Sequence, residues 1–233
     1  MEERIAVFGA GISGQAAARL AGREGAKVTL FDQKTEGANA IFEQADLDQF
    51  DRFVFSPGFA ATHPWRLLVV GSGKPCYGEF SYAASKWKGP LIAITGTNGK
   101  TTTTELLRDA LIAVGKSAHA VGNIGMPLSE LICEGANDGE TIAVCEVSSF
   151  QAELCAGLQV DALIWTNFSE DHLDRYESIE DYFRAKANLL GSLKEGAPFI
   201  LGEDVQRLIE SHGIRVAGAG SKAGPRRVLI IDG

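Results

Sequence analysis

Long hydrophobic runs are absent from this sequence, and no apolar stretch approaches the about 20 residues that a membrane-spanning helix needs. Long basic runs are absent too, and the net charge of -8 argues against nucleic acid as the main partner. The start of the chain does not resemble a signal peptide, because Met1-Glu2-Glu3-Arg4 leads directly into an apolar run. We therefore expect a cytoplasmic monomer with no membrane span and no nucleic-acid partner.

Cysteine is scarce as well. The four cysteines, Cys76, Cys133, Cys145 and Cys155, show no C-x-x-C spacing, which disfavours a metal site built on them. Three of them lie among apolar or small residues, as reduced thiols of a cytoplasmic protein do. The 233 residues, 45% of them hydrophobic, suffice for one large domain or two small ones.

Apolar runs alternate with helix-forming runs in the first third of the chain, which predicts a parallel, doubly wound sheet. A helix is expected at 14–24 and another at 79–87, where Lys88-Gly89-Pro90 ends it. We place a domain boundary there, between a domain of residues 1–88 and a domain of residues 89–233. The predicted strands of the first domain are Ile5–Phe8, Lys27–Phe31, Arg52–Phe55 and one that begins at Val69–Gly71.

A second alternating set follows, with helices expected at 101–114 and 179–190. Its predicted strands are 91–94, 142–147, 162–166, 198–201 and the final apolar run 227–233. Because no helix follows the last strand, the pattern indicates an interruption inside a domain. The predicted fold is α/β, with a Rossmann-like domain followed by an incomplete ATPase domain of the phosphate-loop type.

The most informative segment is Gly96-Thr97-Asn98-Gly99-Lys100-Thr101, between an apolar strand and a helix. Such a turn aims backbone N–H groups and the positive end of a helix dipole at one point. Lys100 supplies a mobile positive charge, and the Thr101 hydroxyl is placed to ligate Mg²⁺. The segment predicts a site for a nucleotide triphosphate, although Ile94 stands where the usual pattern G-x-x-x-x-G-K-[ST] has its first glycine.

A second glycine turn, Gly9-Ala10-Gly11-Ile12-Ser13-Gly14, follows the first strand, and Asp32 ends the second. This G-x-G-x-x-G pattern is typical of turns that admit a diphosphate, with the acid near a ribose. The pattern does not identify the ligand that contains the diphosphate, because NAD, FAD and a nucleotide-sugar all contain one. A tight turn that binds nothing also fits the pattern.

Two polar residues follow other predicted strands of the second domain. Glu146 ends one strand beside the phosphate loop, where folds of this kind hold Mg²⁺. His172 lies in the loop after the strand at 162–166, so it reaches the same edge of the sheet. Both are therefore candidate site residues.

Lys186 lies on the predicted helix that Ser178 caps, with Asp181 three residues after the cap. At about 100° per residue, the lysine falls within the apolar stripe of this helix, while Arg184 points away. A buried ammonium is costly unless it is paired or neutralised, which indicates a functional lysine facing the site. Snorkelling along the apolar surface is the alternative.

Together these segments resemble the Mur ligases of bacterial cell-wall synthesis, whose short T-G-T-N-G-K-T loop lacks the first glycine. The same loop occurs in the related folylpolyglutamate synthetases. The resemblance covers nearly the whole chain, and its motifs occur in order: Gly96–Thr101, Gly122–Gly125, Glu146–Gln151, Ser169–Tyr176 and Tyr182–Lys186.

The resemblance implies an ATP-dependent ligase of peptidoglycan synthesis, which activates a carboxylate as an acyl phosphate for attack by an amine. Ser148-Ser149-Phe150-Gln151 and Glu170–Tyr176 favour the branch that adds D-glutamate to UDP-N-acetylmuramoyl-L-alanine. ATP and Mg²⁺ are the implied cofactors, and Lys100, Glu146, His172 and Lys186 the implied catalytic residues.

The resemblance also assigns ligands to residues. Thr101 and Glu146 would hold one Mg²⁺, and His172 with Lys186, as its carbamate, a second. ATP would bind Gly96, Thr97, Asn98, Gly99, Lys100, Thr101 and Thr102. The UDP-linked substrate would face Gly11, Ser13, Asp32, Ser56, Asn123, Ser148, Gln151 and His172.

Members of this family are nearly twice as long as the chain. We therefore expect the UDP-substrate and phosphate half of an active site, from a fragment or a naturally short protein, without turnover on its own. Two other interpretations stay open. One is a non-catalytic homologue that binds a UDP-sugar. The other is an NAD(P)-dependent oxidoreductase built on residues 9–14, which would leave Lys100, Glu146, His172 and Lys186 unexplained.

Overall fold

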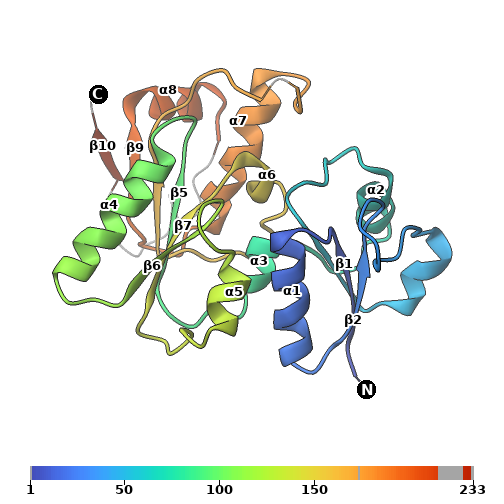
Figure 1. Ribbon diagram of the computed structural model, residues 1–233. Helices are drawn as coiled ribbons and strands as arrows, with labels where there is room; N and C mark the ends of the chain where they lie inside the picture. The colour runs from blue at the N-terminus through green and yellow to red at the C-terminus, as the bar shows by residue number, and fades with distance from the viewer. Residues whose placement is uncertain (1, 173, 215–227, 232–233) are drawn as a thin grey trace.

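The computed structural model describes residues 2–172, 174–214 and 228–231, and they form two parallel sheets (Figure 1). The first sheet has the strand order β2-β1-β3-β4, and the second has the order β10-β9-β8-β5-β7-β6. Helices connect the strands, so the α/β class with two successive parallel sheets is confirmed.

The first sheet contains β1 (Arg4–Phe8), β2 (Lys27–Phe31), β3 (Arg52–Phe55) and β4 (Cys76–Gly78). Its other elements are α1 (Ile12–Arg23), the 3-10 helix η1 (Gln44–Gln49), α2 (Pro64–Gly71) and α3 (Glu79–Ala84). The strand predicted to begin at Val69–Gly71 is wrong, because these residues end α2. Pro64 stands at the first position of that helix, and His63 Nδ1 accepts from Trp65 N at 3.2 Å, so the helix is capped.

The second sheet contains β5 (Leu91–Thr95), β6 (Ala118–Gly122), β7 (Ile142–Glu146), β8 (Ala162–Trp165), β9 (Phe199–Gly202) and β10 (Val228–Ile231). Its helices are α4 (Lys100–Ala113), α5 (Leu128–Cys133), α6 (Ser149–Ala152), α7 (Ile179–Ala187), the 3-10 helix η2 (Asn188–Ser192) and α8 (Glu203–Ser211). The strand expected at 227–233 is present as β10, whereas residues 227, 232 and 233 lie outside the described residues.

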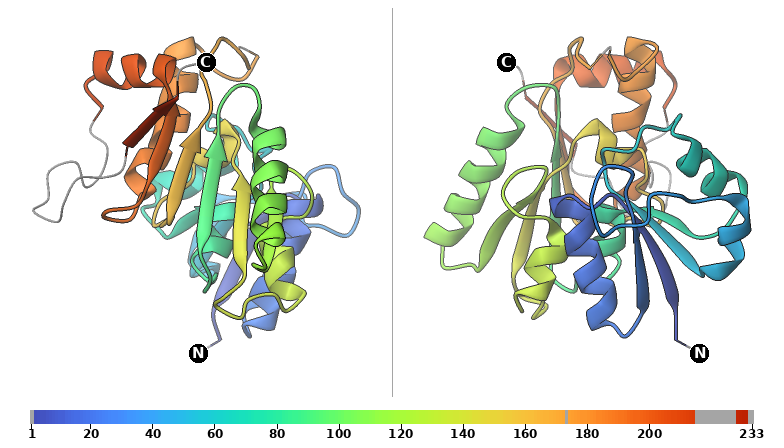
Figure 2. Two further views of the ribbon diagram at one scale, coloured as in Figure 1. Left: turned by 90° about the vertical axis from the view of Figure 1, so that its left-hand side faces the viewer. Right: turned by 45° about the vertical axis from the view of Figure 1, so that its right-hand side comes forward.

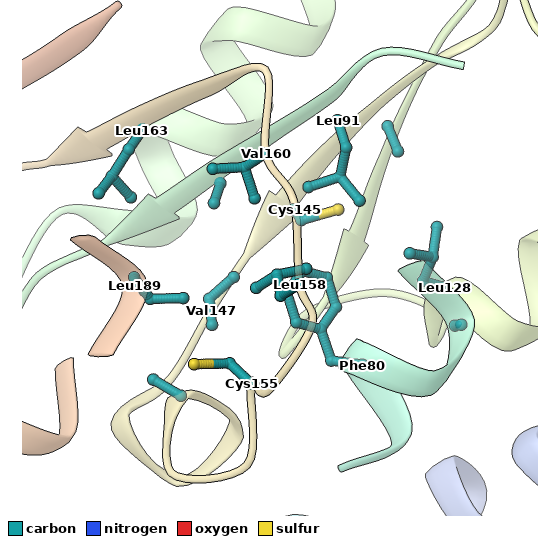
Figure 3. Packing of buried hydrophobic residues seen from close by; sticks show 14 of the residues in the cluster. Phe80, Leu91, Leu128, Cys145, Val147, Cys155, Leu158, Val160, Leu163 and Leu189 are labelled. Carbon is teal, nitrogen blue, oxygen red and sulfur yellow. The ribbon is translucent and has the colours of Figure 1, made fainter. Parts of the chain in front are cut away.

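One hydrophobic core runs through both sheets, because Ile5 and Val7 of β1 belong to the same buried cluster as Ala93 of β5. Figure 3 shows Phe80 of α3 beside Leu158, below strands of the second sheet. Helix α3 follows the first sheet in the chain but packs against α5 of the second. Helices α1 and α5 also lie side by side between the two sheets (Figure 1).

The other face of the first sheet carries an aromatic cluster. Phe8 and Phe55 stack with their ring centroids 4.2 Å apart, and Phe42 meets Phe8 edge-on at 4.9 Å. Such pairs are more favourable than their buried area alone suggests. Phe8 directly precedes Gly9, so the cluster fixes the end of β1 from which the glycine turn begins. Among the described residues, no helix is long and apolar enough to cross a membrane.

Candidate active site

The phosphate loop, residues 96–101, joins β5 to α4. Helix α4 begins at Lys100, and its N-cap Gly99 has a φ of 79°, a left-handed conformation that favours glycine. The first N–H groups of a helix have no partner within it, and Gly99 has no side chain to cap them. Lys100 Nζ donates to the Thr97 carbonyl at 2.8 Å, so the ammonium lies against the loop. This geometry suits an anionic phosphate group.

The end of β8 braces the phosphate loop, a role that sequence reasoning missed. Thr166 Oγ1 donates to the Asn98 carbonyl at 2.7 Å, and Asn167 Oδ1 accepts from Asn98 N at 2.9 Å. A Cβ on Gly96 would lie 2.0 Å from Thr166 Oγ1, so only glycine fits there. The only sequence signal was a polar Thr-Asn pair directly after an apolar strand.

Glu146 ends β7 beneath the phosphate loop and is 1% exposed. Thr101 Oγ1 donates to its Oε2 at 2.7 Å, and Asn123 Nδ2 donates to its Oε1 at 2.8 Å. Gly122 has a φ of 106°, and a Cβ on it would lie 2.4 Å from the Glu146 carbonyl. The structure thus brings three predicted site residues, Thr101, Asn123 and Glu146, into direct contact.

Lys186, in the last turn of α7, is 1% exposed, whereas the Arg184 side chain is 66% exposed. The snorkelling alternative is therefore wrong. Lys186 Nζ donates to the Gly96 carbonyl of the phosphate loop at 2.8 Å and lies 4.8 Å from the centre of the Tyr182 ring. Burial, and secondly the charge of Lys100, lower the pKa of Lys186 to about 7.

His172 follows β8 at the same edge of the sheet. It has a φ of 54°, and it is the only non-glycine residue with positive φ in the described part of the chain. Its ring lies 5.0 Å from the Phe150 ring and 5.7 Å from the Tyr182 ring. Tyr182 Oη lies 3.4 Å from Thr97 Oγ1. Tyr182, for which the sequence predicted no site role, thus borders His172, Lys186 and the phosphate loop.

Ser148 and Gln151 form a capping box at the start of α6. Gln151 N donates to Ser148 Oγ at 3.3 Å, and Ser148 N donates to Gln151 Oε1 at 2.9 Å. Gln151 is buried, so its amide serves the helix N-terminus as well as any substrate role. The structure places both residues after β7, on the same side as Glu146.

The glycine turn after β1 opens onto a separate cavity of about 470 Å³, which we call the glycine-turn pocket. A Cβ on Gly14 would lie 1.7 Å from the Gly9 carbonyl, whereas a Cβ on Gly11 would meet nothing within 4 Å. Four residues predicted to face the substrate line this pocket: Gly11, Ser13, Asp32 and Ser56.

Asp32 braces the glycine turn while it lines the pocket. Its carboxylate accepts from Ala10 N at 2.8 Å and from Lys34 N at 2.8 Å. These backbone hydrogen bonds lower the pKa of Asp32, so it is an anion near neutral pH. The acid predicted to meet a ribose is therefore partly engaged by the protein itself.

A further cavity of about 500 Å³ lies beside the phosphate loop, and the sequence did not predict it. Thr103, Asn167, Asp204 and Arg207 contribute to its lining, together with Trp165. The buried Trp165 Nε1 has no hydrogen-bond partner among the residues that the structure describes.

Within the described ranges, no three His, Cys, Asp or Glu side chains gather as a metal-binding group. The oxygen ligands that the site offers are the Thr101 hydroxyl and the Glu146 carboxylate, 2.7 Å apart. This donor set fits Mg²⁺, which is usually bound through one or two carboxylates together with water and substrate phosphates. It does not fit a fully protein-bound metal.

Residues 94–227 match the family model of the Mur ligase middle domain. The chain is 36% identical over 235 residues to the UDP-N-acetylmuramoylalanine–D-glutamate ligase of Nitratidesulfovibrio vulgaris, covering 91% of this chain and 53% of the relative. It is 39% identical over 205 residues to the ligase of that name from Anaeromyxobacter dehalogenans, covering 81% and 44%. The chain thus spans about half the length of the curated relatives it matches.

Solved structures share the fold at low sequence identity. The UDP-N-acetylmuramate:L-alanyl-gamma-D-glutamyl-meso-diaminopimelate ligase of Neisseria meningitides superposes with a TM-score of 0.59 at 14% identity, covering 100% of this chain and 78% of that one. The murein peptide ligase of Psychrobacter arcticus gives a TM-score of 0.54 at 16% identity, covering 98% and 52%. At these identities the likeness concerns the fold alone.

Proposed function

Because the chain belongs to the Mur ligase family, we propose that it carries the UDP-substrate and ATP-phosphate half of an amide ligase of peptidoglycan synthesis. The observation that carries this proposal is the contact of Thr101 with the buried Glu146 beside the phosphate loop. ATP and a UDP-linked precursor are the proposed reactants, which places the reaction in the cytoplasm. We also propose the boundary near residue 88 as the division between the two binding functions.

The phosphate loop would hold the ATP phosphates during the first step. Backbone N–H groups at the start of α4 would donate to the phosphates, and Lys100 would leave the Thr97 carbonyl to neutralise them. A carboxylate oxygen of the substrate then attacks the γ-phosphorus, ADP leaves and an acyl phosphate forms. The amine of the incoming amino acid next attacks the acyl carbon, and phosphate leaves with the release of one proton.

Thr101 and Glu146 would hold Mg²⁺ at the phosphates. When bound, the ion supplies positive charge against the transferring phosphoryl group. Glu146 is held in place for this by Asn123 Nδ2 at 2.8 Å, so its carboxylate is oriented before ligands arrive. His172, in the loop after β8, would contribute a nitrogen ligand to a second Mg²⁺ together with the carbamate of Lys186.

We also propose that Lys186 reacts with CO₂. In its neutral form the amine nitrogen attacks the carbon of CO₂ and loses a proton, which leaves an anionic carbamate. The buried position of the amine next to Gly96 and Tyr182 supports this step, because burial disfavours the charged ammonium. The carbamate would turn a residue that cannot bind a cation into an oxygen ligand.

The glycine-turn pocket would hold the UDP end of the substrate. Gly11 has no side chain that would occupy the pocket, and Ser13 and Ser56 contribute to the lining. The substrate would then extend toward Asn123, Ser148 and His172. The D-glutamate-adding ligases among the relatives support UDP-N-acetylmuramoyl-L-alanine as the substrate and D-glutamate as the incoming amine.

The Glu146→Gln variant tests the separation of the two sites. Binding of ATP should lose its dependence on Mg²⁺, because an amide is a weaker ligand than a carboxylate, whereas binding of UDP should stay as in the wild type. Calorimetric titrations with ATP, at several Mg²⁺ concentrations, and with UDP measure both properties. Glu140→Gln, at an exposed position, is the matched control. Parallel loss of both ligands in Glu146→Gln would count against two separate sites.

A further inference from the structure

A buried charged cluster joins the two sheets next to the glycine-turn pocket. It consists of Arg66 on α2, Glu153 at the end of α6, and Arg175 with Tyr176 between β8 and α7. The side chains of Arg66, Glu153 and Arg175 are 7%, 9% and 11% exposed. Two arginines thus share one carboxylate away from water, where such contacts are stronger than at the surface.

Both oxygens of Glu153 are occupied. Arg66 Nη1 donates to its Oε2 at 2.5 Å and Arg175 Nη2 donates to the same oxygen at 3.3 Å. The Tyr176 hydroxyl donates to Oε1 at 2.8 Å. Arg66 lies on α2, next to the first sheet, whereas Glu153 and Arg175 belong to the second part of the chain. The ion pair between Arg66 and Glu153 therefore joins the two parts.

The same arginines hold the segment that lines the glycine-turn pocket. The Phe59 carbonyl accepts from Arg66 Nη1 at 2.9 Å and from Arg175 Nη2 at 3.1 Å. Arg175 Nη1 also reaches the Gly58 carbonyl at 3.5 Å. Gly58 and Phe59 line the pocket, so its wall is attached directly to Arg175.

Arg175 is attached to His172 as well. Its backbone N donates to the His172 carbonyl at 3.0 Å. Its guanidinium carbon lies 3.9 Å from the centre of the Phe150 ring, and the His172 ring lies 5.0 Å from that ring. Figure 2 shows the connection between β3 and α2 beside α6, on the side where the second sheet carries α7. Arg175 therefore spans the space between the pocket wall and the His172 segment.

We infer that Arg175 is a positioning residue that fixes the His172 segment against the wall of the glycine-turn pocket. The inference rests on the proposed function, in which a substrate held by its UDP end must present its carboxylate near His172. The distance between the two sites then depends on the link that Arg175 makes between His172 and the carbonyls of Gly58 and Phe59. A planar guanidinium serves two carbonyls and a carboxylate at once, which a single ammonium cannot do.

Hydrogen exchange of backbone amides tests this link in Arg175→Lys, with Arg184→Lys as the matched control. Arg184 is exposed and pairs with Glu180 one turn away. Without ligand, Arg175→Lys should speed exchange by about tenfold in both 57–60 and 174–177, which are far apart in the sequence. The amides of β5 and β7 should keep their wild-type rates, and Arg184→Lys should leave all four segments unchanged.

Added UDP is the second measurement. In the wild type it should slow exchange in 9–14 and also in 174–177, whereas in Arg175→Lys it should protect only 9–14. Wild-type rates at 57–60 in Arg175→Lys, faster exchange throughout the molecule, or equal protection of 174–177 in both proteins would each overturn the role of Arg175. If UDP protects no segment of the wild type, the proposed UDP site fails, and the ligand-free comparison still decides whether Arg175 links the two segments.

Discussion

At the scale of single residues, Lys186 carries the most information. The sequence placed it on an apolar helix stripe, and the structure buries it with its ammonium 2.8 Å from the Gly96 carbonyl. An unmodified lysine at this position donates to the phosphate loop and repels Lys100. Burying a charged group in this way lowers the stability of the fold, so its presence indicates a functional role.

Carbamylation of Lys186 is testable on the chain itself. With ¹³C-labelled bicarbonate and Mg²⁺, we expect a carbamate carbon signal in the NMR spectrum of the wild type. The signal should disappear in Lys186→Arg, because a guanidinium keeps its charge and does not react with CO₂. It should persist in Lys194→Arg, whose lysine is half-exposed and paired with Asp161. A wild-type spectrum without this signal would leave Lys186 as a buried donor to Gly96.

Lys100 offers a second test at this scale. Lys100→Ala removes a charge-assisted contact to phosphate, which is worth about 1.5–3 kcal/mol, so ATP affinity should fall about tenfold to hundredfold. Titration with Mg²⁺-ATP measures the change, and Lys116→Ala at an exposed position controls for the loss of one positive charge. Unchanged affinity in Lys100→Ala would mean that the loop is a turn without a phosphate role.

Part of the candidate site could be predicted residue by residue. The glycines of the two turns, Lys100 and Glu146 were identifiable because each follows or ends an apolar strand. Their residue types also suit phosphate or Mg²⁺ binding. Thr166 and Asn167 were missed because their role depends on a loop about 70 positions earlier in the chain, and no local pattern reveals that contact. The capping contact of Gln151 was hidden for a different reason, since the amide suits a substrate as well as a helix end.

Among the elements, the alternation of apolar and helix-forming runs predicted most strands and the helices α1, α3, α4 and α7. It missed β6 and α8, although these span five and nine residues. The 64–71 segment has the apolar residues of a strand, and only His63 and Pro64 at its start mark it as a helix. Strand β4 and helix α6 span three and four residues, too few for a period to show. Their places follow from pairing and packing with distant parts of the chain.

Helix α3 contains a buried carboxylate that makes stability depend on pH. Glu79 Oε1 accepts from Ser129 N of α5 at 3.2 Å, and burial raises the pKa of Glu79 to about 7. A carboxyl with a raised pKa binds its proton more tightly in the folded state. The folded protein should therefore lose stability as the pH rises from about 4.5 to about 7, by on the order of 3 kcal/mol.

The Glu79→Gln variant should remove this loss. Its neutral amide can still accept from Ser129 N, so the melting temperature should match the wild type at pH 5 and exceed it at pH 8. The neighbouring Cys145 thiol adds no charge in this range, because burial raises its pKa. Thermal unfolding at the two pH values, with Glu140→Gln as control, measures the effect. An equal shift at both pH values would show that Glu79 acts through packing and not through its charge.

At the scale of the whole molecule, the sequence indicated two alternating units but not how they join. The structure runs one hydrophobic core through both sheets and adds the Arg66–Glu153–Arg175 contacts beside the pocket. Arg66 and Glu153 lie outside every motif, and Arg175 lies within the 169–176 motif without a predicted role, because each is an ordinary charged residue until its partners are known. The two proposed sites are therefore held on one packed body, although they were predicted as parts of separate domains.

The glycine-turn pocket should hold a UDP-linked precursor and not a nicotinamide dinucleotide. Gly11→Leu should fold, because a Cβ there meets nothing within 4 Å, while its side chain fills the pocket. Gly22→Leu, at an equally open position on α1, is the control. Calorimetric titration with UDP-N-acetylmuramoyl-L-alanine and with NADH decides the matter. We predict that the wild type and Gly22→Leu bind the UDP precursor, that Gly11→Leu binds it at least about tenfold more weakly, and that none binds NADH. Binding of NADH by the wild type, with no binding of the UDP precursor, would mean that the pocket is a dinucleotide site.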